Sequence, residues 1–249
     1  MNEENGQMPV PFRVEFTSRM NTRELIMALV WLPIHVFGLP LLGGWLLAEG
    51  ILTELQANLM IYVAGTVYIL LAEFTFLRRE YDPLCDHFFY CAIQILSCYI
   101  GMLALNMLSS GILSLLGKLA GSAEELNNLN NDAIMDYVLQ ERNVTSAMVI
   151  YLAPIVEEVL FRGAIFGGIR GKSRRAAYLL SVLLFSVYHV WGYASADPAY
   201  WLYLLQYIPA GLMLCRCYEK TNSVWTCIFF HMLTNGIALR AFEEVAELL

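Results

Sequence analysis

The chain of 249 residues is more apolar than a soluble domain of this size. Hydrophobic residues make up 58% of the sequence, charged residues 15%, and the mean hydropathy is +0.56, whereas charged residues are roughly a quarter of a typical soluble protein. The formal net charge of −7 and the absence of a basic motif argue against a nucleic-acid partner. The composition therefore predicts an integral membrane protein whose surroundings are the lipid bilayer.

Apolar runs recur along the chain at lengths near the ~20 residues that a helix needs to cross a bilayer. They lie at about 24–48, 59–77, 88–116, 146–169, 176–193, 199–215 and 222–239. Prolines interrupt some of them, at Pro33, Pro40, Pro154 and Pro209, and membrane helices tolerate proline as kinks. We expect an all-α, polytopic bundle of about seven transmembrane helices, with an eighth span or a re-entrant segment left open.

The domain organisation follows from these runs. We expect one transmembrane domain over residues 24–240, with the polar residues of functional interest within 146–240, an N-terminal tail at 1–23 and a C-terminal tail at 241–249. The connection at 117–145 is rich in Glu, Asp and Asn and predicts a short amphipathic helix near 132–141.

Lysine and arginine are concentrated in alternate connections. They precede the first run or follow the second, fourth and sixth, as Arg13, Arg19, Arg23, Arg78, Arg79, Arg170, Lys172, Arg174, Arg175, Arg216 and Lys220. The remaining connections are poor in Lys and Arg. Because cytoplasmic loops carry the excess of positive charge, seven spans predict a cytoplasmic N-terminus and an external C-terminus.

The six cysteines lie in or beside the predicted spans, or on the predicted cytoplasmic side, and form no CxxC pair. We interpret them as small buried apolar residues rather than metal ligands or disulfides.

Three polar clusters interrupt the apolar runs of the C-terminal half. They are Glu157-Glu158 with Arg162, then His189, then His231 with Asn235. Ionisable groups within a membrane are costly unless paired or hydrated, so they are functional candidates by default. Taken singly, each also has a structural explanation: a stabilised kink near Pro154 or an ion path, a buried core histidine, and a hydrogen bond between helices.

Helical spacing separates the two glutamates. Glu158 and Arg162 are four residues apart and are expected to form an ion pair on one face. Glu157 points about 100° away and lacks that partner, so it is the better candidate for a general base. Counted from the predicted span ends, Glu157, His189 and His231 lie at similar depth, which predicts one shared site.

Such a site has the parts of a hydrolase. A carboxylate and a histidine can deprotonate water, while a second histidine and the Asn235 amide can donate to the oxygen of an attacked carbonyl group.

The segments EEVLFRG at 157–163, FSVYH at 185–189 and HMLTN at 231–235 together resemble the EExxxR, FxxxH and HxxxN motifs of the CAAX protease and bacteriocin-processing (Abi) family of intramembrane glutamic endopeptidases. The resemblance covers about residues 146–240. It implies Glu157 and His189 as activators of water and His231 and Asn235 as oxyanion donors, with Glu158, Arg162 and Phe185 in support.

The resemblance also implies a membrane-associated peptide or protein as substrate, no cofactor, and the plasma membrane of a bacterium as location. One alternative is a zinc protease with Glu157, His189 and His231 as ligands, although no HExxH helix is present. Another is a proton-coupled transporter or a non-catalytic scaffold with a polar cavity, although no internal repeat supports a transporter.

Overall fold

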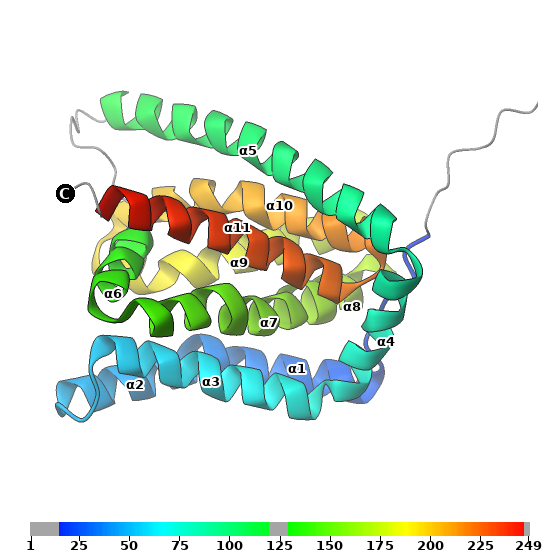
Figure 1. Ribbon diagram of the computed structural model, residues 1–249, viewed down its shortest axis with the longest axis horizontal. Helices are drawn as coiled ribbons and strands as arrows, with labels where there is room; N and C mark the ends of the chain where they lie inside the picture. The colour runs from blue at the N-terminus through cyan, green and yellow to red at the C-terminus, as the bar shows by residue number, and fades with distance from the viewer. Residues whose placement is uncertain (1–14, 120–128, 247–249) are drawn as a thin grey trace, which may run out of the picture.

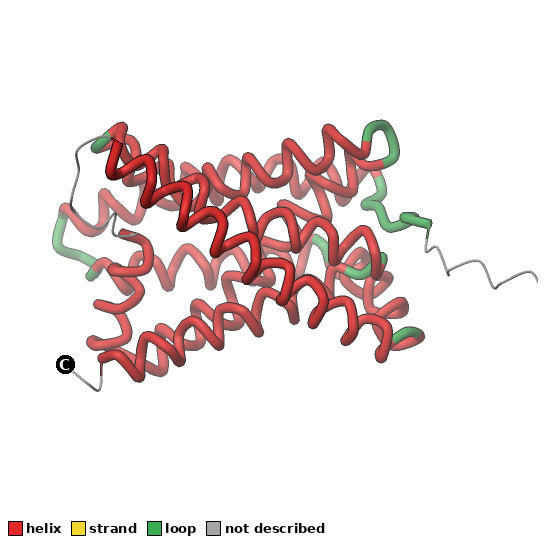
Figure 2. The backbone as a smooth tube through the Cα atoms, turned by 90° about the horizontal axis from the view of Figure 1, so that it is seen from above, coloured by secondary structure: helices red, strands yellow, loops and turns green. Residues whose placement is uncertain are grey.

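The computed structural model describes residues 15–119 and 129–246, and every regular element in these two stretches is a helix (Figures 1 and 2). The elements are α1 (Thr22–Pro33), η1 (Ile34–Gly38), α2 (Leu39–Ala48), α3 (Glu54–Ala72), α4 (Phe74–Asp86), α5 (Phe88–Leu119), α6 (Leu129–Ser146), η2 (Ala147–Leu152), α7 (Ala153–Glu158), η3 (Val159–Phe166), α8 (Gly167–Arg170), α9 (Arg174–Ala196), η4 (Pro198–Tyr203), α10 (Leu204–Thr221) and α11 (Val224–Ala246). The predicted all-α class is confirmed.

Among the described residues, five helical stretches are long and apolar enough to cross a membrane: Thr22–Ala48, Glu54–Ala72, Phe88–Lys118, Asn131–Arg170 and Arg174–Ser195. In the stretches 22–48 and 88–118, only 17% of the most apolar window is buried within the protein, which leaves large apolar surfaces for lipid. The protein is therefore an integral membrane protein. The sixth and seventh predicted runs are also helical, as α10 and α11, but polar residues such as Gln206, His231 and Asn235 lower their hydropathy.

The second predicted run, 59–77, has the wrong boundaries. The span α3 ends at Ala72, and the chain turns at Glu73, whose φ of −107° and ψ of 16° are not helical. A separate amphipathic helix, α4, follows and buries Phe76, Leu77, Glu80 and Leu84 on one face. The error arose because the apolar residues of this face extend the hydropathy of the preceding span.

Prolines shape the interrupted spans. Pro33 ends α1 and is followed by the π-helical turn η1, and Pro154 lies in the first turn of α7, directly after the π-helical turn η2. The amphipathic helix expected near 132–141 is confirmed as α6, which bends at Glu141 (φ −149°, ψ 79°) before it continues into η2.

The helices run between two ends of the bundle (Figure 1), and the residues at these ends differ in charge. The basic end comprises residues 15–21, α4, the 170–174 connection and the 221–223 connection. The acid-rich end comprises the 49–53 turn, α6, the 197–203 segment and the end of α11. This alternation agrees with the predicted separation of charged connections. Some segments of that prediction lie outside the described residues: Arg13, much of the 1–23 tail, part of the 117–145 connection and residues 247–249.

The main hydrophobic core lies around η3, α9, α10 and α11, where Leu160, Phe166, Tyr218, Ile228 and Phe230 are fully buried. Five of the six cysteines are buried, as expected, whereas Cys85 in α4 is exposed. This core fixes the helices that carry the three polar clusters.

Candidate active site

The two adjacent glutamates form the last two residues of α7, where the chain enters the π-helical segment η3. Their exposed fractions are 2% for Glu157 and 0% for Glu158. Both carboxyl groups are thus held inside the bundle, on a helix flanked by π-helical turns, which are frequent at functional sites.

The predicted ion pair between Glu158 and Arg162 is confirmed. Arg162 Nη1 donates to Glu158 Oε1 at 3.1 Å, and neither side chain is exposed. The same carboxylate oxygen accepts from His231 Nδ1 at 2.8 Å. The Arg162 guanidinium lies 4.2 Å from the centre of the Phe185 ring, so Phe185 supports the pair from the second motif. Glu158 therefore connects the arginine to the third motif.

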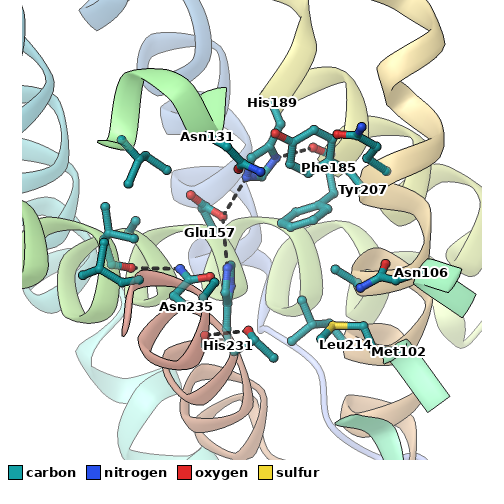
Figure 3. A pocket seen from close by; sticks show the side chains of 18 of the residues that line it. Met102, Asn106, Asn131, Glu157, Phe185, His189, Tyr207, Leu214, His231 and Asn235 are labelled. Carbon is teal, nitrogen blue, oxygen red and sulfur yellow. Dashed lines mark hydrogen bonds and ion pairs between the residues drawn. The ribbon is translucent and has the colours of Figure 1, made fainter. Parts of the chain in front are cut away.

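Glu157 is less completely bonded than its neighbour. Its buried Oε2 atom has no hydrogen-bond partner, and it lies 3.7 Å from His189 Nε2 and 3.9 Å from His231 Nε2 (Figure 3). These distances exceed those of a direct hydrogen bond, but they suit two groups that share a bridging water molecule.

His189 is held in one orientation by its backbone and by aromatic rings. Its Nδ1 atom lies 2.8 Å from the carbonyl oxygen of Phe185, one helical turn earlier. A carbonyl oxygen only accepts, so Nδ1 carries the proton, and in the neutral ring Nε2 is a free acceptor directed at Glu157. Tyr207 of α10 stacks on the imidazole with ring centres 4.5 Å apart.

Asn235 lies one turn after His231 on α11. Its Nδ2 atom donates to the carbonyl oxygen of Val149 at 2.9 Å, which orients the amide and leaves its second N–H group available. Asn235, Glu157, His189 and His231 line one cavity of about 620 Å³. Their predicted convergence is confirmed, while their catalytic roles stay a prediction.

The sequence analysis missed three residues near the site. His35 and Tyr62 lie in the part of the chain that has no motif, and Tyr188 lies on a face of α9 to which no function was assigned. The Tyr188 hydroxyl bonds to that of Tyr62 at 3.1 Å and to His35 Nε2 at 3.2 Å. The Tyr62 hydroxyl also interacts with the Glu157 carboxyl group. His35 is 1% exposed and packs closely against Gly65, where a Cβ atom would lie 3.0 Å from the ring.

A cue for His35 was present in the sequence, because it is an ionisable residue in an apolar run between Pro33 and Pro40. Tyr62 and Tyr188 offered none, since tyrosines are common in membrane helices. Ser186 also lies in α9, and its buried hydroxyl has no hydrogen-bond partner.

No group of three or more His, Cys, Asp or Glu side chains among the described residues is arranged to hold a metal ion. The zinc alternative with Glu157, His189 and His231 as ligands stays a prediction.

Comparison with known proteins finds a family match in the same part of the chain. Residues 141–237 match a family described as type II CAAX prenyl endopeptidase Rce1-like. This range contains all three motifs, so the resemblance predicted from them is confirmed. No solved structure is significantly similar to the chain.

Two curated relatives are each similar to part of this chain. A Bacillus subtilis (strain 168) protein named "Putative membrane peptidase YdiL" is 30% identical over 122 residues, which are 48% of this chain and 46% of that protein. A Lactococcus lactis subsp. lactis (strain IL1403) protein named "UPF0177 protein YxdF" is 32% identical over 101 residues, 39% and 51% of the two chains. The chain spans about half the length of these relatives.

Proposed function

We propose that this membrane protein, whose residues 141–237 resemble the Rce1-like endopeptidases, is an intramembrane endopeptidase that cuts a membrane-associated peptide or protein with a water molecule activated by Glu157 and His189. The observation that carries the proposal is the cavity where three helices bring Glu157, His189, His231 and Asn235 together. Within it, one carboxylate oxygen of Glu157 is buried without a hydrogen bond.

In the first step, a water molecule in the cavity hydrogen-bonds to both Glu157 Oε2 and His189 Nε2, which are 3.7 Å apart. Glu157 takes a proton from this water while the oxygen adds to the carbonyl carbon of the scissile peptide bond. His189 accepts the second hydrogen bond of the water and directs its lone pair. The Phe185 carbonyl, by fixing the protonated Nδ1, keeps Nε2 free for this task.

In the second step, the oxyanion of the tetrahedral intermediate accepts from the free N–H group of Asn235 and from His231 Nε2. Because His231 Nδ1 already bonds to Glu158, donation from Nε2 requires the doubly protonated ring, whose charge the Glu158 carboxylate offsets. Glu157 then passes its proton to the leaving nitrogen, and the C–N bond breaks to give a carboxylic acid and an amine.

We also infer the location and orientation of the protein. Its similarity to proteins of two bacteria supports the plasma membrane of a bacterium. The concentration of Lys and Arg at the basic end supports a cytoplasmic position for that end, with the C-terminus external.

The proposal is tested with purified protein in lipid vesicles and a set of fluorogenic peptides carrying a membrane anchor. We expect hydrolysis that persists with a metal chelator. Activity lost on chelation and restored by Zn²⁺ would favour the zinc alternative. If no peptide is cut while Glu157→Gln abolishes a proton-linked flux, the protein is a transporter instead.

A further inference from the structure

The cavity at Glu157 extends toward the acid-rich end of the bundle. Its lining includes Asn131 and Tyr137 of α6, which belong to that end, and Asn58 in the second turn of α3, which follows the 49–53 turn. Asn131 is exposed at the surface. The cavity therefore connects the buried carboxylate to the side of the bundle that carries few cations.

Toward the basic end, in contrast, the core is filled by large side chains. Leu160, Phe161, Phe166 and Tyr218 are each at most 2% exposed. They pack in the same cluster. This packing blocks access to Glu157 from the basic end, in agreement with the cavity, which extends the other way.

One wall of the cavity is the inner face of α5. Met102, Asn106, Ser109 and Ser110 line it and recur at the spacing of one helical face. Elsewhere on this helix, Met107 and Leu108 are 78% and 61% exposed. A span that turns apolar residues outward and amides and hydroxyls inward is suited to an occupant that requires hydrogen bonds.

An extended polypeptide has that requirement. Its backbone N–H and C=O groups are costly to bury in a membrane without partners. Gln206 and Thr234 add polar groups on the walls formed by α10 and α11, so the cavity offers donors and acceptors from several helices (Figure 3).

The entrance carries negative charge. The described residues of the acid-rich end, together with the helix termini next to it, include seven carboxylates and three cations. The carboxylates are Glu49, Glu54, Asp132, Asp136, Glu141, Asp197 and Glu244, and the cations are Lys118, Arg142 and Arg240. A potential of one sign around a cleft raises the local concentration of ligands of the opposite sign. The charge thus selects among peptides that the polar walls alone would accept.

We propose that the cavity admits a cationic stretch of polypeptide from the acid-rich end, with its main chain hydrogen-bonded to the polar face of α5. This proposal deepens the proposed function and rests on it for the cleavage step. Binding and direction of entry do not require cleavage, so they are tested separately.

Binding is measured with the Glu157→Gln variant in nanodiscs of neutral phosphatidylcholine. The probes are a fluorescent lysine-rich peptide and the same peptide with glutamate in place of lysine. We expect the lysine-rich probe to bind about tenfold more tightly at low salt, and the difference to shrink as salt screens the charges. Equal affinity of the two probes would overturn the proposed preference.

A matched pair of variants locates the charge that matters. Asp132→Asn with Asp136→Asn removes two exposed carboxylates beside the cavity, and Asp82→Asn with Asp86→Asn removes two exposed ones at the basic end. Only the first pair should weaken binding of the lysine-rich probe, by several-fold. Equal weakening by both pairs would mean that net charge alone attracts the peptide, and it would contradict the proposed entrance at the acid-rich end.

The direction of entry is measured by labelling with a membrane-impermeant maleimide. Exposed Cys85 reports on the basic end, and a Cys85→Ser, Ser110→Cys variant reports on the cavity wall. We expect the two thiols to react from opposite sides of the membrane. Reaction from the same side would overturn the proposed entrance, even if the protein hydrolyses peptides. Normal binding and labelling without hydrolysis would instead reject the proposed function alone.

Discussion

Two buried glutamates show how differently this molecule treats the same side chain. At the basic end, Glu219 Oε1 accepts from Arg170 Nε at 2.6 Å and Arg174 Nε at 2.7 Å, while Oε2 accepts from Arg174 Nη2 at 2.7 Å and Tyr178 Oη at 2.9 Å. In the cavity, Glu157 Oε2 accepts from no group at all. Glu219 thus has hydrogen-bond donors on both carboxylate oxygens, whereas Oε2 of Glu157 remains available to a molecule that enters the cavity.

The pKa of Glu219 reflects this saturation. Burial alone raises the pKa, but hydrogen bonds from Arg174, Arg170 and Tyr178 outweigh it and lower the pKa to about 2. Such a group stays ionised and structural at any ordinary pH. Buried charge is thus no sufficient sign of a functional site here. The incomplete bonding of Glu157, beside two histidines and a cavity, is what separates it from Glu219.

The largest effect expected from breaking this contrast is on stability. Arg162→Met leaves the Glu158 carboxylate buried without its ion-pair partner, which should cost about 3–5 kcal/mol of unfolding free energy. Arg174→Met at the basic end removes a partner whose side chain is 60% exposed and should cost about 1 kcal/mol or less. Denaturant titration in detergent compares the two, and equal losses would contradict the difference between the regions.

Asn235→Ala tests the oxyanion role. Losing one donor to the oxyanion should lower kcat by on the order of 10², or roughly 3 kcal/mol in the barrier. The control is Asn58→Ala at the far end of the same cavity, which should leave kcat within a few-fold. Unfolding is followed in parallel for both. A large loss of activity in both variants would mean that amide removal disturbs the cavity in general.

Glu73 extends the contrast to pH, because it is buried at the basic end with neither oxygen hydrogen-bonded. Burial, with a smaller contribution from Glu24, raises the pKa of Glu73 to about 7. A raised pKa means that the fold favours the neutral form, so stability is unaffected at pH 4, below the ordinary pKa of 4.5, and falls as the pH rises through 7.

Glu73→Gln should therefore leave stability nearly unchanged at pH 4 and raise it by about 2 kcal/mol at pH 8. Thermal unfolding in detergent at the two pH values measures this. A gain of the same size at both values would show that the titration of Glu73 is not the cause.

The smallest expected effect concerns the hydroxyl groups next to Glu157. Tyr62→Phe removes the group that bonds to Tyr188 and interacts with Glu157. Removal of one hydrogen bond of about 1 kcal/mol should lower kcat about fivefold with little change in KM. Tyr178→Phe, which takes the same group from Glu219, is the control and should not change kcat. A change confined to KM would assign Tyr62 to substrate binding.

Sequence reasoning succeeded where a local rule applied. Hydropathy predicted the helical bundle, and the spacing of Glu158 and Arg162 predicted their ion pair, which survives the π-helical turns of η3. It failed at Glu73, where one apolar face of α4 prolonged the preceding span. The links from Glu158 to His231 and from Tyr62 to Tyr188 join residues 73 and 126 positions apart, and only the packing of the helices determines such pairs.

The central claim is that Glu157 is the base that activates water. The most direct test is the rate of peptide hydrolysis by Glu157→Gln, with Glu219→Gln as the matched control and a chelator present throughout. We predict that Glu157→Gln lowers kcat by on the order of 10² or more while the protein stays folded, and that Glu219→Gln keeps its kcat. Full activity of folded Glu157→Gln protein would contradict the account.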